Sequence, residues 1–222
     1  MVFKRARSEE QKNIRRDQII EATIKLLEKE PLENITLASI ASELNFSRAN
    51  LYKYVTTREE IFLWIVASDA EKWVEGLQQR LESYDHLELK PFCYIWAEQI
   101  YQNKRLVKLF SLLTIVLEKS STLTAFETFK QDFYSNFSQL RVIIKRLLPD
   151  LSNEQFRYFI HYQMHYALGQ FSSIVSNKEQ RQALKIAKSS CNKRDFVLEF
   201  AEYLEVIVIG LKTVKNNTFI AD

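Results

Sequence analysis

Apolar residues recur every three to four positions over most of this 222-residue chain, a period that predicts amphipathic helices. No segment shows a convincing alternation of apolar and polar residues with the period of a strand. Only 3 glycines and 3 prolines are present, so we expect long helices with few turns. Beyond the first 57 residues, helices are predicted over 58–83, 103–119, 123–148, 152–176, 179–188 and 195–212, and one more begins at residue 90. The predicted fold class is therefore all-α.

Residues 36–44 have the pattern of a short, capped helix. Apolar side chains stand at positions 37, 40, 41 and 44, so one face is apolar. Thr36 stands immediately before this run, where its hydroxyl can accept a hydrogen bond from an unpaired N–H of the first turn. Asn45 follows the run. Because asparagine tolerates a left-handed backbone, it can end the helix in a sharp turn.

A second helix is predicted over residues 48–54, directly after that turn. Ser47 is its candidate N-cap, Leu51 faces inward, and Phe46 fills the core beneath the turn. The other side chains of this helix remain largely free. A helix with exposed N-terminal side chains has the geometry that enters the major groove of DNA.

The long helix that follows also has a start signal. Thr57 and Glu60 have the spacing of a capping box, with Thr57 as N-cap and Glu60 reaching back. Any single cap or leucine in this region is equally compatible with an ordinary helical core. The joint pattern of two short helices, a tight turn and a third helix favours a helix-turn-helix that binds DNA.

At this point the sequence resembles the N-terminal domain of TetR-family transcriptional regulators, over roughly residues 10–65. The most specific feature is Ser-x-x-x-Leu-Tyr-x-Tyr, followed by one basic and two acidic residues. The matching residues are Ile19, Ile20, Ala22, Leu26, Leu27, Ile35, Thr36, Ile40, Ala41, Leu44, Ser47, Leu51, Tyr52, Tyr54, Arg58, Glu59, Glu60 and Ile61. Three positions depart from the family pattern: Asn45 replaces the usual Gly, Val55 the usual Phe, and Arg58 the usual Lys, whose charge it keeps.

The resemblance implies a regulator that binds a double-stranded DNA operator. Residues expected to position the protein through phosphate contacts are Thr36, Ser47, Tyr52, Tyr54 and Arg58. Candidates for reading base edges are Arg48, Ala49, Asn50 and Lys53. Asn50 can bond an adenine edge and Arg48 a guanine edge. We expect a DNA-binding domain in residues 1–56 and a helical domain for effector binding and dimerisation in residues 57–222.

The charge distribution adds one further candidate. The net charge is only +3, so the chain as a whole is not predicted to bind nucleic acid over its entire surface. Residues 1–16, however, hold six basic residues against two acidic ones: Lys4, Arg5, Arg7, Lys12, Arg15 and Arg16 against Glu9 and Glu10. These residues can form a basic arm that contacts phosphate or the minor groove, or simply a solvated start of the chain. Both interpretations stay open.

Cysteine usage and hydropathy bear on the compartment. Cys93 and Cys191 stand far apart and outside any C-x-x-C pair, which is typical of reduced thiols in the cytoplasm. The charged N-terminus lacks the apolar core of a signal peptide. The longest apolar run, residues 206–211, is too short to span a bilayer. We expect a cytoplasmic protein with no membrane partner and no cofactor.

Aromatic residues gather on the predicted helices 123–148 and 152–176, with polar residues between them. Most of these rings are expected to form core. An apolar cavity with a few polar anchors is nevertheless the usual form of a small-molecule site, and the family resemblance implies such an effector site here. The candidate effector-binding residues are Trp96, Gln99, Phe110, Phe133, Phe137, Tyr162, His165 and Tyr166. The expected effector is a small apolar or aromatic molecule.

The last long helices suggest an interface between two copies of the chain. Residues 152–176 and 196–211 are apolar over a wider arc than one buried face requires. Such helices suit a four-helix interface, and the resemblance implies a homodimer formed this way. Burial inside one chain is the alternative. Two recognition helices about 34–36 Å apart would read a palindromic operator, so we predict a homodimeric repressor that an effector releases.

Two other functions are kept as alternatives. His161 and His165 are four residues apart and could hold one metal ion in an all-helical enzyme, but no third ligand is evident. The glutamate that follows the first His in zinc proteases is missing as well. No Gly-rich phosphate loop is present either, and no enzyme activity is predicted. The second alternative is a DNA-binding protein that does not respond to a ligand and acts architecturally or through a protein partner.

Overall fold

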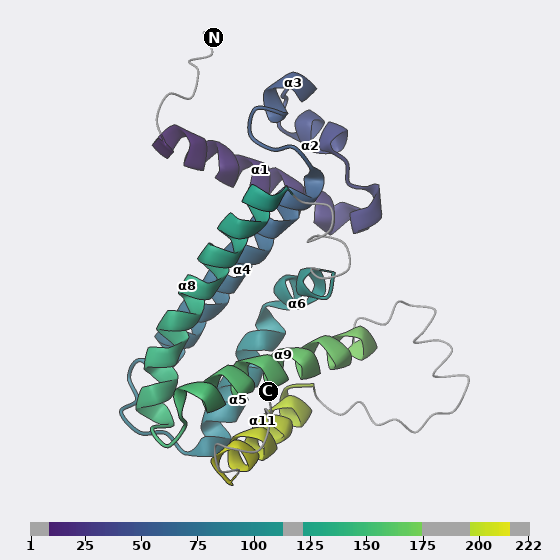
Figure 1. Cartoon of the computed structure of the whole chain (residues 1–222). Helices are drawn as coiled ribbons and strands as arrows, with labels where there is room; N and C mark the ends of the chain where they lie inside the picture. Colours follow the sequence, from purple (N-terminus) through teal and green to yellow (C-terminus); the bar gives the residue numbers. More distant parts are fainter. Residues whose placement is uncertain (1–8, 113–121, 175–195, 214–222) are drawn as a thin grey trace, which may run out of the picture. The chain divides into compact units, whose positions relative to one another are not determined.

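The computed structural model describes residues 9–112, 122–174 and 196–213, and every regular element within these ranges is helical (Figure 1). The all-α prediction is confirmed. The elements are α1 (Glu9–Lys29), the 3-10 helix η1 (Leu32–Asn34), α2 (Leu37–Glu43), α3 (Arg48–Leu51), α4 (Arg58–Leu81), α5 (Leu89–Gln102), α6 (Lys104–Phe110), α8 (Leu123–Leu147), α9 (Asn153–Ile174) and α11 (Phe196–Thr213). The helix predicted at 179–188, Cys191 and the basic residues Lys4, Arg5 and Arg7 lie outside the described residues.

The chain divides into two compact units. The first contains residues 1–68 and 112–133, and the second contains residues 69–111 and 134–222. Helices α4 and α8 therefore each begin in the first unit and end in the second. The functional boundary that we place after residue 56 stays a prediction.

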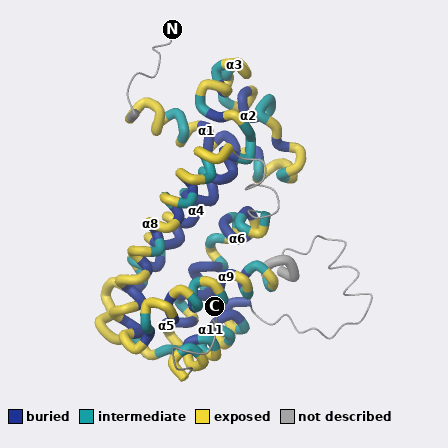
Figure 2. The backbone as a smooth tube through the Cα atoms, in the orientation of Figure 1, coloured by how far each residue is buried: buried dark blue, intermediate teal, exposed yellow. Residues whose placement is uncertain are grey.

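Aliphatic side chains from four helices form the core of the first unit. Ile19 of α1, Ile40 of α2 and Ile61 of α4 are fully buried, and Leu51 of α3 is 1% exposed, as predicted. The buried positions recur along α4 in Figure 2. Burying an aliphatic side chain of this size stabilises a fold by about 1.5–3 kcal/mol. The four-residue α3 is therefore held by packing rather than by its own propensity.

The first part of α8 belongs to the same unit and meets α1. The guanidinium carbon of Arg16 lies 5.0 Å from the centroid of the Trp64 ring, a cation–π arrangement. Arg16 Nη2 also lies 3.7 Å from Asp132 Oδ2 on α8. One arginine of α1 thus contacts both α4 and α8.

Four aromatic rings from α4, α5 and α9 form the centre of the second unit. Trp73 and Trp96 meet edge to face with their ring centroids 5.4 Å apart, and Trp96 and Phe159 do the same at 5.0 Å. Phe92 lies 5.7 Å from Trp96. Trp96 Nε1 donates a hydrogen bond of 3.2 Å to Gln163 Oε1, inside this apolar cluster.

Most helix boundaries match the predicted ranges within a few residues, but two helices differ. The helix predicted over residues 103–119 ends at Phe110, where α6 gives way to a turn. The second helix of the helix-turn-helix was expected over residues 48–54, whereas α3 ends at Leu51. The N–H groups of Lys53 and Tyr54 bond carbonyls three residues back instead of four, so the chain tightens into turns after Leu51. β-Branched residues at 55–57 disfavour continuation of the helix.

Close packing at Gly76 generates a stability prediction. A Cβ atom at this position would lie 1.9 Å from Nε2 and 2.9 Å from Cδ of Gln99, which is 6% exposed. We expect Gly76→Ala to lower the free energy of unfolding by about 1–3 kcal/mol, because the buried amide must move. Gly169→Ala is the matched control, since a Cβ on this helical glycine meets nothing within 4 Å. It should raise the stability by up to about 1 kcal/mol. Urea unfolding followed by helicity measures both, and a Gly76→Ala variant as stable as the parent would contradict the packing.

Candidate nucleic-acid interface

Side-chain caps begin both short helices of the helix-turn-helix. Thr36 Oγ1 accepts a 3.1 Å hydrogen bond from the N–H of Ser39, and Ser39 Oγ accepts a 2.9 Å bond from the N–H of Thr36. Ser47 Oγ accepts a 3.2 Å bond from the N–H of Asn50. Both predicted N-caps are confirmed. The reciprocal partner of Thr36 is a serine in place of the more common Glu or Gln.

The turn between the two helices has the left-handed backbone predicted for it. Asn45 has φ 54° and is the only non-glycine residue in the described part of the chain with positive φ. The N–H of Asn45 bonds the carbonyl of Ser42, and the N–H of Phe46 bonds that of Ala41 at 2.8 Å. These two bonds form a Schellman motif, which closes the C-terminal end of α2. Phe46 is half-buried, with the Arg15 guanidinium 5.6 Å from its ring centroid.

This turn leaves one surface of α3 open. Arg48, Ala49 and Lys53 are exposed, and Tyr52 is 57% exposed. Asn50 and Tyr54, at the edge of the same surface, are half-buried, as are Thr57, Arg58 and Glu59 in the first turn of α4. The side chains predicted to read bases thus come from one short helix and the turn after it.

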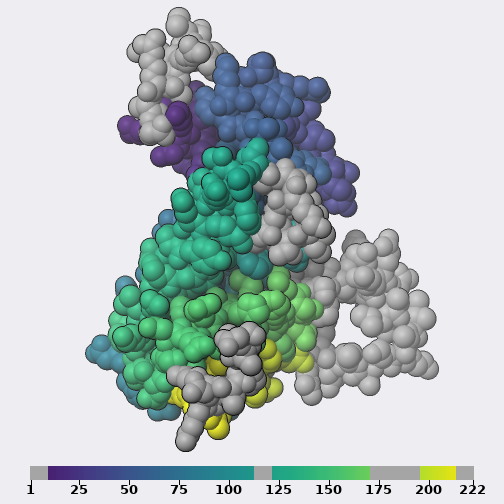
Figure 3. All heavy atoms as spheres, viewed as in Figure 1, coloured from purple at the N-terminus to yellow at the C-terminus, as the bar shows by residue number. Residues whose placement is uncertain are grey.

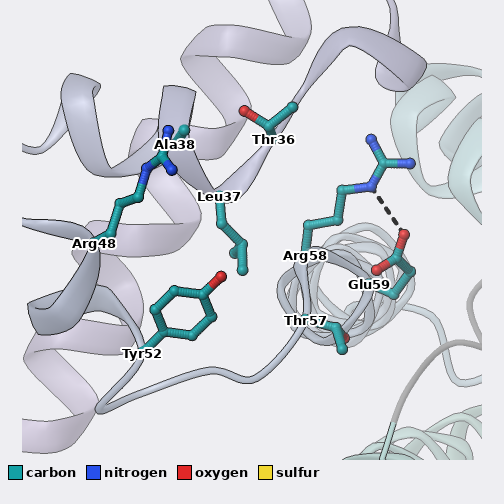
Figure 4. Close-up of a pocket in the computed structure, with 8 residues that line it drawn as sticks. All are labelled: Thr36, Leu37, Ala38, Arg48, Tyr52, Thr57, Arg58 and Glu59. Atoms are coloured by element: carbon teal, nitrogen blue, oxygen red, sulfur yellow. Dashed lines mark hydrogen bonds and ion pairs between the residues drawn. The ribbon is translucent and has the colours of Figure 1, made fainter.

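A concave notch of about 560 Å³ lies beside this surface (Figure 4). Four of the nine predicted DNA-binding residues line it: Thr36, Arg48, Tyr52 and Arg58. The other lining residues are Leu37, Ala38, Thr57 and Glu59, none of which is among the predicted DNA-binding residues. Figure 4 shows Tyr52 and Arg58 on opposite sides of Leu37. Ser47, Ala49, Asn50, Lys53 and Tyr54 do not line the notch.

Arg58 makes contacts within the protein that local spacing does not reveal. Its Nη1 donates hydrogen bonds to the carbonyl oxygens of Ile35, at 2.6 Å, and Glu33, at 3.2 Å. Its Nε donates to Glu59 Oε1 at 2.9 Å. The two carbonyl groups lie 23 and 25 residues earlier in the chain, so no sequence motif links them to Arg58.

Glu60 is a buried carboxylate, 5% exposed, with partners on both oxygens. The N–H of Glu60 donates to Thr57 Oγ1 at 3.3 Å, as the predicted capping box requires. Its Oε2, however, accepts from the N–H of Thr56 at 2.8 Å, one residue before the expected position. Its Oε1 accepts from the hydroxyl of Thr122 at 2.7 Å. No sequence motif links Thr122 to Glu60, because 62 residues separate the pair.

The eight candidate effector residues are distributed over both units. Trp96 and Gln99 are buried on α5, and Tyr166 of α9 stacks on Tyr203 of α11 with the ring centroids 3.9 Å apart. Phe133 is buried in the first unit, whereas the other seven belong to the second. Phe110, Phe137 and Tyr162 are half-buried, and His165 is exposed.

Three buried donors have no acceptor among the described residues: Trp73 Nε1, Gln163 Nε2 and Arg80 Nη1.

The surroundings of the histidine pair and of Cys93 bear on the metal-enzyme alternative. The ring centroids of His161 and His165 lie 4.2 Å apart. The pKa of His161 is lowered, mainly because the ring is partly buried and also because His165 carries a like charge when protonated. Within the described ranges, no three His, Cys, Asp or Glu side chains gather as a possible metal site. Burial, and then the charge of Glu205, raise the pKa of the Cys93 thiol to about 12. Its thiol therefore stays protonated at neutral pH.

Two family models match the chain and together cover nearly all of it. Residues 19–65 match the model described as "Bacterial regulatory proteins, tetR family". Residues 67–215 match the "Tetracyclin repressor-like, C-terminal domain" model. The chain belongs to the TetR family. The predicted recognition is thereby confirmed, and the protein is a helix-turn-helix, DNA-binding transcription regulator of a family that is not enzymatic.

One solved structure supports the same fold over 90% of the chain. This TetR-family protein is similar to the TetR family repressor AlkX from Dietzia sp. strain DQ12-45-1b, described as implicated in biodegradation of n-alkanes. The TM-score is 0.53 at 15% sequence identity, and the match covers 90% of this chain and 96% of that chain. No curated protein sequence matches the chain significantly. No helix in the described part is long and apolar enough to cross a membrane.

The turn residue Asn45 generates a test of the helix-turn-helix geometry. Its φ of 54° favours glycine, the residue that TetR-family proteins usually have here. We expect Asn45→Gly to retain or raise the thermal stability, and Asn45→Ala to lower the free energy of unfolding by about 1 kcal/mol. Thermal unfolding compares the two variants. An alanine variant at least as stable as the glycine variant would rule out the left-handed turn.

Proposed function

We propose that this TetR-family regulator is a repressor that binds a palindromic operator as a homodimer and leaves it when a small-molecule effector binds. The observation that carries the DNA-binding part is the capped α3 with its open surface beside the notch. The structurally similar AlkX is a repressor, and we assign the same sign of regulation here. Such a protein acts in the cytoplasm, where its operator is.

In this proposal, phosphate contacts come from Thr36, Ser47, Tyr52 and Tyr54, and base contacts from Arg48, Ala49, Asn50 and Lys53. The family resemblance implies a phosphate contact from Arg58 as well. Exposure of Arg48, Lys53 and Tyr52 supports these assignments. The position of Arg48, Ala49 and Asn50 on the four-residue α3 supports the base contacts too, because side chains of the first turn of a recognition helix are those that reach base edges. Arg58 has further contacts, which are considered below.

The surface of α11 supports dimerisation. Leu198, Val206 and Ile209 are 53%, 67% and 56% exposed and lie on one side of this helix. The adjacent α9, whose atoms are visible at the surface in Figure 3, adds the stacked pair of rings Tyr158 and Tyr162. Exposed apolar surface of this kind is typical of an interface. A second copy of the chain would bury it in a four-helix arrangement.

The buried donors of the second unit support an effector with an oxygen acceptor. Trp73 Nε1 and Gln163 Nε2 lie next to Trp96 in the aromatic cluster. A buried donor without an acceptor costs about 1–3 kcal/mol. A carbonyl, hydroxyl or carboxylate oxygen on an otherwise apolar molecule would remove this cost. The proposed effector is therefore small and largely apolar, and it carries one such oxygen.

Release from DNA would be a shift between two populated arrangements. An effector can lower the affinity for the operator only to the extent that it binds more tightly to the arrangement with weak DNA affinity than to the other arrangement. The helices available to carry this effect are α4 and α8, because both contribute residues to the two units. We propose the first turn of α4 as the lever, since it also lines the notch.

Operator binding is tested by selecting bound DNA from a random pool and repeating the selection with apolar compounds that carry an oxygen acceptor. In the enriched sequence, Asn50→Ala should abolish discrimination at one position, worth about 1–3 kcal/mol. Tyr52→Phe should weaken all variants of the site by a similar factor, because it removes a phosphate contact. Affinities for single-base variants of the site measure both effects. If no sequence is enriched and affinity follows salt alone, the architectural alternative is correct.

The dimer is tested with two exposed valines. Val206→Asp should raise the dissociation constant of the dimer by more than about 100-fold, because it would bury an unpaired charge in the interface. Val142→Asp is the control, since Val142 is 71% exposed on α8 and Val206 is 67% exposed on α11. Sedimentation equilibrium distinguishes one 26.3 kDa chain from two. Equal masses for the two variants would exclude this face as the interface.

A further inference from the structure

Arg58 connects the start of α4 to the main chain that precedes α2. The carbonyl groups that Nη1 binds belong to Glu33 and Ile35, and Ile35 immediately precedes Thr36, the N-cap of α2. Ile35 is fully buried, so this part of the main chain is fixed in the core. In Figure 4, Arg58 extends from the first turn of α4 towards the side of the notch that holds Thr36. The two bonds therefore determine how the starts of α2 and α4 are spaced.

The charge of Arg58 already has a partner within the protein. Glu59 Oε1 lies 2.9 Å from Nε, and the two side chains are only 14% and 29% exposed. A carboxylate this close offsets much of the attraction that the guanidinium would exert on a DNA phosphate. Two of the three guanidinium nitrogens are engaged by this carboxylate and by the two carbonyl groups.

We propose that Arg58 is a positioning residue: it orients α2, and through α2 the DNA-reading helix α3, instead of anchoring a phosphate. α2 has only seven residues, and its Schellman turn at Asn45 passes its orientation directly to α3. A shift at the start of α2 therefore moves Arg48 and Asn50 relative to the bases. The inference rests on the proposed function, because it concerns how the operator is read.

Arg58→Lys and Arg58→Gln separate the two roles. Lysine keeps the charge, but its side chain ends one bond earlier than arginine and lacks the planar fork that serves several acceptors at once. Glutamine removes the charge as well. The full-length chain and both variants are titrated with the selected operator fragment and with a scrambled fragment of equal length, at several salt concentrations. Circular dichroism gives the helical content of each variant.

If Arg58 positions the reading surface, both variants bind the operator at least about tenfold more weakly, the scale expected for losing hydrogen bonds to a charged group. Binding to scrambled DNA changes less than about twofold, and the salt dependence of operator binding keeps its slope, because no phosphate contact is lost. If Arg58 anchors a phosphate, Arg58→Lys binds like the parent. Arg58→Gln then binds both DNA fragments more weakly than the parent does, and the slope of its salt dependence falls by about one. That second result overturns the inference.

Amide hydrogen exchange of the free protein gives a readout that needs no DNA. Residues 37–44 should exchange faster in both variants, while α9 exchanges as in the parent, because only the support of α2 is lost. Unchanged exchange in residues 37–44 overturns the inference. So does loss of helical content in both variants, since Arg58 would then stabilise the whole fold. Failure of the parent chain to enrich any DNA sequence would instead refute the proposed function, and the exchange result would still stand.

Discussion

The two helices that form the reading surface are too short to be stable through their own hydrogen bonds, and this constraint governs the first unit. α2 has 7 residues and α3 has 4, whereas isolated helices shorter than about 12–15 residues are marginal in water. Most main-chain groups at their ends therefore need a partner from elsewhere. Thr36 and Ser47 supply such partners at the starts of the two helices. Arg58 and Glu60 bind main-chain groups of the segments that flank them. The geometry presented to DNA follows from these side chains as much as from the apolar core.

Glu60 joins three segments of this unit through one carboxyl group. It binds Thr56, which follows the turns after α3, it lies in the first turn of α4, and it accepts from Thr122. The Thr122 hydroxyl in turn accepts from the N–H of Ala125 at 3.3 Å, so Thr122 caps the start of α8. A buried carboxylate is tolerated because both of its oxygens have donors. The starts of α4 and α8 are thereby held to the end of the reading surface, which gives both long helices a physical route to influence it.

Local features of this fold could be predicted from the sequence, and contacts between distant segments could not. The caps at Thr36 and Ser47 and the turn at Asn45 involve residues within five positions of each other, so spacing reveals them. The bond from Arg58 to the carbonyl of Ile35 is different, because any side chain of sufficient reach can bind a main-chain oxygen and leaves no pattern. Aromatic spacing on one helix is equally uninformative about tertiary neighbours. Phe133 and His165 are both candidates for the effector site, and only the structure shows that Phe133 is buried in the first unit and that His165 is exposed on α9 in the second.

The identity of residue 58 shows why a motif match can conceal a change of role. The family pattern usually has lysine here, and charge alone would make arginine an equivalent residue. The two side chains differ in reach and in the number and direction of their donors. Here the guanidinium binds two carbonyl groups and a carboxylate at once, an arrangement that the shorter lysine, with its single nitrogen, cannot reproduce. A basic residue conserved in charge can therefore act as an internal support for the reading surface, with the charge itself largely offset by its neighbour Glu59.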